Sequence, residues 1–292
     1  MSLFPGFRVH RTQVAVGAIH SLIGGAGPPV LLLHGHPQTH VMWHRVAPVL
    51  AESFTVVCAD LRGYGASAKP WGSGDHALYS KRAMAEDMVA VMRGLGFERF
   101  HLIGHDRGGR VAHRLARDHR SRVQSLTVLD IAPTLAMYEN TTRAFAEAYW
   151  HWFFLIQPEP LPELLISADR AAYVHRMLGR SGHEIFDPAA LAAYIEGNAT
   201  AEGVHAMCED YRAANTIDLD HDRADLAHKL DVPVLALWGA KGVINRCFDP
   251  IALWRDVAIS VAGHAVPSGH YLAEENPRAV LAAVLPFLRA AS

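Results

Sequence analysis

The chain has 292 residues, half of them hydrophobic, and a formal net charge of −2 at pH 7. This length suits one large domain with an insertion and a sizeable core. The absence of a basic surplus argues against nucleic-acid binding, and no apolar run reaches the roughly 18 residues of a membrane span. The first ten residues lack a secretory pattern and the three cysteines are scattered. We therefore expect a cytoplasmic protein with reduced thiols.

Over the first 130 residues, short apolar runs rich in β-branched residues alternate with helical patterns. The first run, 12–21, alternates weakly and predicts an edge strand. Further strands are predicted at 30–35, 55–60, 100–105 and 123–130, and helices at 83–95 and 109–119. Strands that alternate with helices indicate a mostly parallel sheet covered on both faces, which is an α/β class of fold.

After Pro133 the pattern changes. Residues 135–221 are helix-like, with aromatic residues crowded at 149–154 and no clear strand. Strand and helix patterns then return, with strands at 232–240 and 257–265, a helix at 250–256 and a final helix from Pro277. We predict a core domain of residues 1–134 and 222–292, interrupted by a helical cap domain of residues 135–221.

The stretch LIGHDRGGR, residues 102–110, has the form of a nucleophile elbow, G-x-S-x-G, with Asp106 in place of the serine. A carboxylate is suited to displacement at a saturated carbon, which forms an ester of the protein that water then hydrolyses. A helix N-terminus would also keep Asp106 ionised. The alternative is that Asp106 only caps the helix at 107–118, because aspartate is a favoured cap.

Hydrolysis of such an ester needs a base for water, and the base needs an acid to orient it. His270 lies in PSGHYLAEENP, between the last predicted strand and the last helix. Asp130 ends the strand at 123–130 and is our choice for the orienting acid, although it could instead be a simple turn residue. After the next strand no carboxylate occurs before Asp249, which is the competing choice. These residues all follow strands, at the sheet edge where α/β folds bind ligands.

Four segments carry a family resemblance: HLIGHDRGGRVAHRLARDH, LDIAPT, YWHWFFLIQP and CEDYRAA. Together they resemble the haloacetate (fluoroacetate) dehalogenases, a family with the α/β-hydrolase fold and a helical cap. The similarity runs over nearly the whole chain. The elbow alone would also suit epoxide hydrolases and haloalkane dehalogenases. The resemblance implies no metal or organic cofactor, a small-molecule haloacid as the partner, and a homodimer.

The resemblance also implies roles for two groups of residues. Arg107 and Arg110 would hold the substrate carboxylate, to which a guanidinium fork is well matched. His151, Trp152 and Tyr211 would supply N–H and O–H donors to the departing halide. The alternative for AYWHWFF is the packed face of a cap helix. The later arginines of the same helix, Arg114 and Arg117, are expected to be solvated.

The segment HGHPQTHVMWH follows the strand at 30–35. By analogy with related folds, the backbone N–H of His36 and that of Arg107 would form the oxyanion hole. Many family members have another aromatic residue at position 36, so the histidine departs from the pattern. A zinc site built from His34, His36, His40 and His44 is disfavoured, because they straddle a turn and no cysteine or carboxylate joins them. The segment 178–186 offers no evident wall residue, so substrate size stays open.

The resulting expectation is a dehalogenase in which Asp106 displaces halide from C2 of a 2-haloacetate and His270, with Asp130, activates water. An epoxide hydrolase would use the same nucleophile and base, with Tyr211 and either Tyr149 or Tyr173 to protonate the epoxide. A non-catalytic receptor on this fold is a third possibility, which the intact aspartate–histidine set argues against. The preferred halogen, tolerance at C2 and the physiological substrate stay open.

Overall fold

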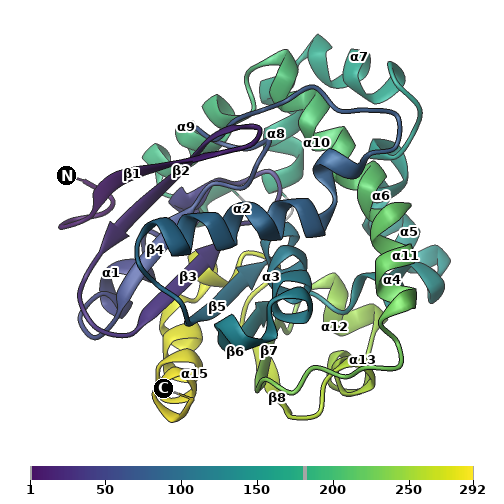
Figure 1. The fold of residues 1–292 in the computed structure, drawn as a ribbon. Coiled ribbons are helices and arrows are strands. Elements are labelled where there is room, and N and C mark those ends of the chain that lie inside the picture. The colour runs from purple at the N-terminus through teal and green to yellow at the C-terminus, as the bar shows by residue number, and fades with distance from the viewer. Residues whose placement is uncertain (1, 180–182, 292) are drawn as a thin grey trace.

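A computed structural model describes residues 2–179 and 183–291, and it is built around an eight-stranded sheet (Figure 1). The strands are β1 (Arg8–Val14), β2 (Gly17–Gly24), β3 (Pro29–Leu33), β4 (Thr55–Ala59), β5 (Phe100–His105), β6 (Val123–Leu129), β7 (Val234–Gly239) and β8 (Val261–Val266). Their order is β1-β2-β4-β3-β5-β6-β7-β8. β2 pairs antiparallel with both β1 and β4, and the other pairs are parallel, so the expected mostly parallel α/β sheet is confirmed.

The two faces of the sheet pack in separate apolar clusters, since successive side chains of a strand point to opposite faces. Leu31 and Leu33 of β3 belong to one apolar cluster, with residues of α2 (Lys81–Gly94) and α3 (Arg107–Asp118). Val30 and Leu32 belong to a second cluster, with residues of α1 (Ala47–Leu50) and α15 (Pro277–Ala290). The remaining helices of the C-terminal part are α12 (Val243–Cys247), α13 (Pro250–Val257) and α14 (Leu272–Glu275).

Between β6 and β7, the described part of the chain forms helices and no strand. They are α4 (Thr134–Glu139), α5 (Arg143–Ala148), α6 (Trp150–Leu155), α7 (Leu161–Ala168), α8 (Arg170–Leu178), α9 (Pro188–Gly197), α10 (Ala201–Ala214) and α11 (Ile217–Ala224). In Figure 1 this group lies above and to the right of the sheet. A third apolar cluster, which includes Phe145, Trp152 and Tyr211, joins several of these helices. Residues 180–182, part of the segment for which the sequence offered no pocket wall, lie outside the described residues.

The expected single edge strand at 12–21 is wrong. The segment is a hairpin in which β1 and β2 pair as Val14 with Gly17, around a two-residue turn at 15–16. Gly17 has φ 123°, a conformation that β-carbon-bearing residues rarely adopt. The turn was missed because its two residues are apolar and continue the alternation. The last strand also starts later than expected, at Val261, because α13 extends to Val257.

The expectation that Arg114 and Arg117 are solvated is also wrong. The side chain of Arg114 is only 3% exposed and forms ion pairs with Asp118, Asp222 and Asp225. Arg117 donates to Nε2 of His113 and to the backbone carbonyls of Asp225 and His228. Two of the carboxylates that bind Arg114 lie at the end of α11, Asp222 within it and Asp225 directly after it, about 110 residues further along the chain.

No helix in the described ranges combines the length and apolar character needed to cross a membrane.

Candidate active site

The elbow sequence forms a sharp turn between β5 and α3, with Asp106 at its tip. Asp106 has φ 46° and ψ −117°, a strained conformation for a residue with a β-carbon. Gly108 makes this turn possible, since a β-carbon there would lie 2.4 Å from the carbonyl oxygens of Leu33 and His34. Asp106 precedes the first residue of α3, yet its side chain makes no capping hydrogen bond. The helix-cap alternative therefore does not account for this carboxylate.

The Asp106 carboxylate is 5% exposed, and its Oδ1 accepts a hydrogen bond of 2.9 Å from the backbone N–H of His36. Of the two backbone donors expected for an oxyanion hole, only His36 makes this contact in the described structure. Burial by itself raises the pKa of Asp106, but His270, His105, Arg107 and Arg110 outweigh it and hold the pKa well below its usual range. Asp106 is thus an ionised carboxylate in a buried site.

His270 lies in the loop between β8 and α14, and its Nδ1 is 2.6 Å from Oδ2 of Asp130. Asp130 follows β6 directly, has φ 51°, and accepts a second hydrogen bond from the N–H of Gly239 at 2.8 Å. The side chain of the competing acid, Asp249, instead caps α13 by accepting from Ala252. The structure thus brings His270 together with Asp130 and uses Asp249 elsewhere. His105 contacts the carbonyl of His270 at 2.8 Å and holds the loop in place.

The two arginines beside Asp106 have different surroundings. The guanidinium of Arg107 is fully buried and pairs bidentately with Asp210, through Nε at 2.9 Å and Nη2 at 2.8 Å. Tyr64 donates to the same carboxylate at 2.6 Å, and Lys81 forms an ion pair with it. The Nε and Nη2 groups of Arg107 are therefore occupied by Asp210, and only Nη1 is left without a hydrogen-bond partner among the described residues.

Arg110 forms no ion pair with any carboxylate of the described chain. It is 3% exposed and donates to the carbonyl of Ala132 and to Oγ1 of Thr134. Its Nε has no hydrogen-bond partner in the same part of the chain, and its Cζ lies 4.7 Å from the centre of a Trp152 ring. Burial and the nearby Arg107 lower its pKa from the usual value, although Asp106 opposes them. A buried guanidinium without a counter-ion is costly, and an anionic ligand would relieve that cost.

The three residues expected to bind halide are close together. His151 and Trp152 are on α6, and Tyr211 is on α10. The Tyr211 ring lies 5.8 Å from that of His151 and 6.4 Å from that of Trp152, between ring centres. Trp152 Nε1 and the Tyr211 hydroxyl are buried and without hydrogen-bond partners in the described ranges. Burial, followed by the charge of Asp106, raises the pKa of Tyr211 well above its usual value, so its hydroxyl stays a donor.

Asp210 is the residue of this site that the sequence reasoning missed. It sits within CEDYRAA, directly before Tyr211, and is fully buried. Burial raises its pKa, but Arg107 and Lys81 outweigh this and hold it well below the usual range. Nothing in the sequence sets Asp210 apart from its charged neighbours Glu209 and Arg212. Its partner could not be inferred, because Arg107 is 103 residues earlier in the chain.

The histidines considered for zinc have hydrogen-bond partners instead. His34 contacts the carbonyl of Gly35 and accepts from the N–H of Leu61, and His44 contacts the carbonyl of Val41. Among the described residues, His40 is the one of the four that joins a group with ligand-like spacing, with His20 and Asp60. Both oxygens of Asp60 already accept backbone N–H groups.

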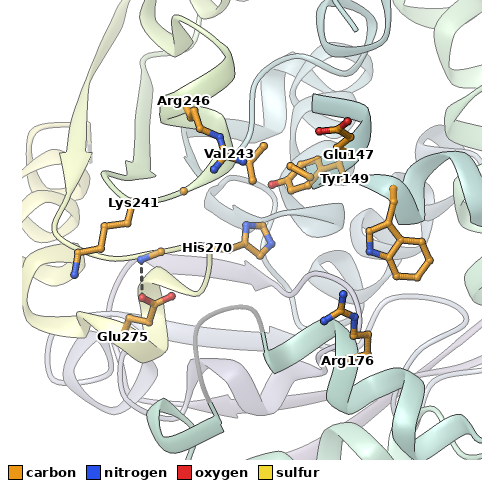
Figure 2. Close-up of a pocket in the computed structure, with 12 residues that line it drawn as sticks. Glu147, Tyr149, Arg176, Lys241, Val243, Arg246, His270 and Glu275 are labelled. Carbon is orange, nitrogen blue, oxygen red and sulfur yellow. Dashed lines mark hydrogen bonds between the residues drawn. The ribbon is translucent and has the colours of Figure 1, made fainter. Parts of the chain in front are cut away.

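Two cavities that share lining residues lie near Asp106. The inner one, of about 20 Å³, is lined by Asp106 and His270 together with His36, Tyr149, His151, Met177 and Tyr271. This is room for little more than one water-sized sphere, which favours a small substrate. The outer pocket, of about 500 Å³, shares Tyr149 and His270 with it. Figure 2 shows His270 in this outer pocket, between Arg246 of the core and Arg176 of α8.

Comparisons with known proteins agree with this geometry. Residues 28–277 match the alpha/beta hydrolase fold family. The chain is 46% identical to a fluoroacetate dehalogenase from Burkholderia sp., over 94% of this chain and 91% of that protein. It is 34% identical to a soluble epoxide hydrolase from Corynebacterium sp., over 95% and 96% of the two chains.

Among solved structures, an alpha/beta hydrolase from Nostoc sp. PCC 7120 superposes with a TM-score of 0.95 and 52% identity. The match covers 97% of this chain and 98% of that one. The dehalogenase is more similar in sequence than the epoxide hydrolase. Asp106, Asp130 and His270 lie together in one site. The chain belongs to the alpha/beta hydrolase fold family and, within it, to the haloacetate dehalogenases.

Proposed function

We propose that this protein hydrolyses 2-haloacetates to glycolate and halide through an ester on Asp106. The observation that carries the proposal is Arg110, a buried guanidinium beside the nucleophile that forms no ion pair with any described carboxylate. A haloacetate would bring the missing negative charge, whereas a neutral epoxide or alkyl halide would leave it uncompensated. The small volume of the inner cavity beside Asp106 favours the smallest acids over larger ones.

In the proposed first step, a carboxylate oxygen of Asp106 attacks C2 of the substrate and the carbon–halogen bond breaks. Arg110, through Nε, and Arg107, through Nη1, hold the substrate carboxylate with one donor nitrogen each. The halide leaves toward Trp152 and Tyr211, whose donors have no other partner in the described structure. These donors stabilise the charge that develops on the halogen.

In the proposed second step, Nε2 of His270 takes a proton from water, and the resulting hydroxide attacks the carbonyl carbon of the ester. Asp130 accepts the Nδ1–H of His270, which fixes the tautomer and stabilises the imidazolium that forms. The His36 N–H, already on Oδ1, stabilises the oxyanion of the tetrahedral intermediate. When the intermediate collapses, the leaving alkoxide takes the proton held by His270 and departs as glycolate. The new carboxyl group of Asp106 releases its proton to solvent, which regenerates the carboxylate.

The direct test is halide release from fluoro-, chloro- and bromoacetate, with glycolate measured in parallel. We expect one glycolate for each halide, and loss of both in Arg110→Met, which keeps the length of the side chain and removes the charge. Arg143→Met, in an exposed pair with Glu147, is the matched control and should leave turnover unchanged. No halide release from any of the three acids by the wild type would contradict the proposal.

An epoxide hydrolase is the second candidate, favoured by the tyrosines around the nucleophile. Tyr173 contacts His36 at 3.3 Å, the Tyr211 ring lies 5.5 Å from that of His36, and Tyr149 lines the inner cavity. Two such phenols could protonate an epoxide oxygen. Diol formation from styrene oxide without halide release from chloroacetate would favour this candidate.

Trp152→Phe separates a halide donor from a residue that only packs in the cap. The variant keeps most of the ring and removes the indole N–H. Fluoride, the strongest hydrogen-bond acceptor among the halides, should depend most on that donor in the transition state. We expect kcat for fluoroacetate to fall by about 10²-fold or more, the effect of one lost oxyanion-type donor, and kcat for bromoacetate to fall far less. An equal small loss for both substrates would assign Trp152 to packing.

We also propose that the protein works in the cytoplasm and as a homodimer, as the family resemblance implies. Analytical ultracentrifugation at several protein concentrations tests the second point, and a single species of about the chain's mass of 32.0 kDa would contradict it.

A further inference from the structure

The side chain of His36 has no role in the mechanism described so far. Only its backbone N–H contacts Asp106. The imidazole is 4% exposed and lines the inner cavity that also contains the nucleophile and His270. A buried polar ring in the wall of a cavity this small is positioned to contact whatever occupies it.

The His36 ring also lies among the residues proposed to receive the halide. The rings of His36, His151 and Tyr211 form a triangle. Between ring centres, His36 is 6.2 Å from His151 and 5.5 Å from Tyr211, and the other two are 5.8 Å apart. The His36 side chain is therefore as close to Tyr211 as His151 is.

Of the two nitrogens of the His36 ring, one has a hydrogen-bond partner in the described structure and the other has none. Nε2 lies 3.3 Å from the hydroxyl of Tyr173. Nδ1 is buried and has no hydrogen-bond partner within residues 2–179 and 183–291. Burial lowers the pKa of His36 to about 4, although Asp106 and Asp210 oppose the shift. At neutral pH the ring is uncharged and carries a single N–H.

The surroundings place that N–H on Nδ1. If the Tyr173 hydroxyl donates to Nε2, the proton of the imidazole must be on Nδ1. The opposite tautomer would leave a lone pair on Nδ1 in a site that contains the ionised Asp106 and receives an anionic substrate, which is electrostatically unfavourable. A buried donor without a partner carries a desolvation cost that an anion in the cavity would remove.

We propose that His36 is a specificity-determining residue whose Nδ1–H donates to the leaving halide, and that Tyr173 positions it by fixing the tautomer. This inference rests on the proposed dehalogenase function and adds a donor to Trp152, Tyr211 and His151. The charge on the halogen is greatest in the transition state, so the added donor lowers the barrier most for fluoride, the halide with the most concentrated charge.

His36→Phe is the main test, because it keeps an aromatic ring of similar size and leaves the backbone N–H on Asp106. We expect kcat for fluoroacetate to fall on the order of 10- to 100-fold, and kcat for bromoacetate to fall by much less. An equal loss for both substrates, or no loss, would overturn the proposal. A rise in KM for both with kcat unchanged would mean that the ring contacts the carboxylate, which also overturns it.

Two further variants separate donation from packing. Tyr173→Phe leaves His36 in place and removes the hydroxyl that fixes its tautomer, so we expect a smaller loss that is again selective for fluoroacetate. His20→Phe is the matched control: His20 is also buried, and its Nδ1 also has no hydrogen-bond partner in the described structure, but it does not line the cavity. This control should keep the ratio of the fluoroacetate and bromoacetate rates at the wild-type value.

Chloride binding tests His36 without any turnover. Tryptophan fluorescence titrated with chloride should give a Kd that is roughly tenfold higher or more in His36→Phe than in the wild type. If the wild type turns over no haloacetate, the proposed function fails, yet this titration still decides whether His36 donates to a halide. Equal chloride affinity in the two proteins would overturn the inference while leaving the dehalogenase function standing.

Discussion

In His270→Ala incubated with excess chloroacetate, we expect an ester to accumulate on Asp106 and steady-state turnover to be lost. The first step needs only an ionised carboxylate, a held substrate and a place for the halide, and none of these depends on the imidazole as a base. The second step needs a base for water, and general-base catalysis typically contributes 10²–10⁴-fold. Mass spectrometry of the Asp106 peptide should show the added mass of a carboxymethyl group, and chloride release should stop near one equivalent.

Two control variants show whether the modification depends on Asp106 and whether the loss of turnover is specific to His270. Asp106→Asn should release no chloride and carry no modified peptide, since the nucleophile is gone. His264→Ala removes an exposed histidine of β8 that lines neither cavity, and it should turn over at the wild-type rate. An unmodified Asp106 in His270→Ala, or continued turnover near the wild-type rate, would contradict the two-step mechanism.

Local patterns in the sequence were enough to predict most strands of the sheet and the turn that carries Asp106. The elbow is local because its glycines, its strand and its helix are contiguous, so residues 102–110 predict the turn that the structure contains. The hairpin at 8–24 was missed because Ala15 and Val16 do not interrupt the apolar alternation. The single useful signal was Gly17, and one glycine does not distinguish a turn from a bulge.

Electrostatic partners were the least predictable feature. Arg107 and Arg110 are less than one helical turn apart and have similar sequence surroundings. The structure nevertheless pairs Arg107 with Asp210 of α10 and gives Arg110 no ion pair with any described carboxylate. Arg114 was predicted to be solvated, but it forms ion pairs with carboxylates at the C-terminal end of α11. In each case the partner comes from a helix about 100 residues away, and which cap helix covers which residue of α3 is decided by tertiary packing.

The sequence offers two candidates for the orienting acid, and the structure gives them different surroundings. Asp130 and Asp249 both follow strands of the sheet, and spacing alone favours neither strongly. In the structure Asp130 is fully buried against His270, with its second oxygen on Gly239. Asp249 is exposed and caps α13.

Asp130→Asn is therefore expected to slow turnover on the order of 10⁴-fold, as for triad aspartates, while the first halide is still released. In the variant, the Gly239 N–H needs an acceptor, so it bonds to the amide oxygen of the new asparagine. The amide NH₂ then faces Nδ1 of His270. Nδ1 must then carry a lone pair, which places the proton on Nε2, and an Nε2–H cannot accept a proton from water. Stopped-flow chloride detection should show a burst of about one equivalent followed by a very slow phase.

Asp249→Asn is the matched control, because asparagine caps a helix as well as aspartate does and α13 should be undisturbed. We expect its steady-state rate to stay within about twofold of the wild type, the ordinary range of a surface substitution. A crippled Asp249→Asn with a mild Asp130→Asn would assign the acid to the other strand. Loss of the burst in Asp130→Asn would mean that Asp130 also supports the alkylation step. That result would contradict its assignment to the hydrolysis step alone.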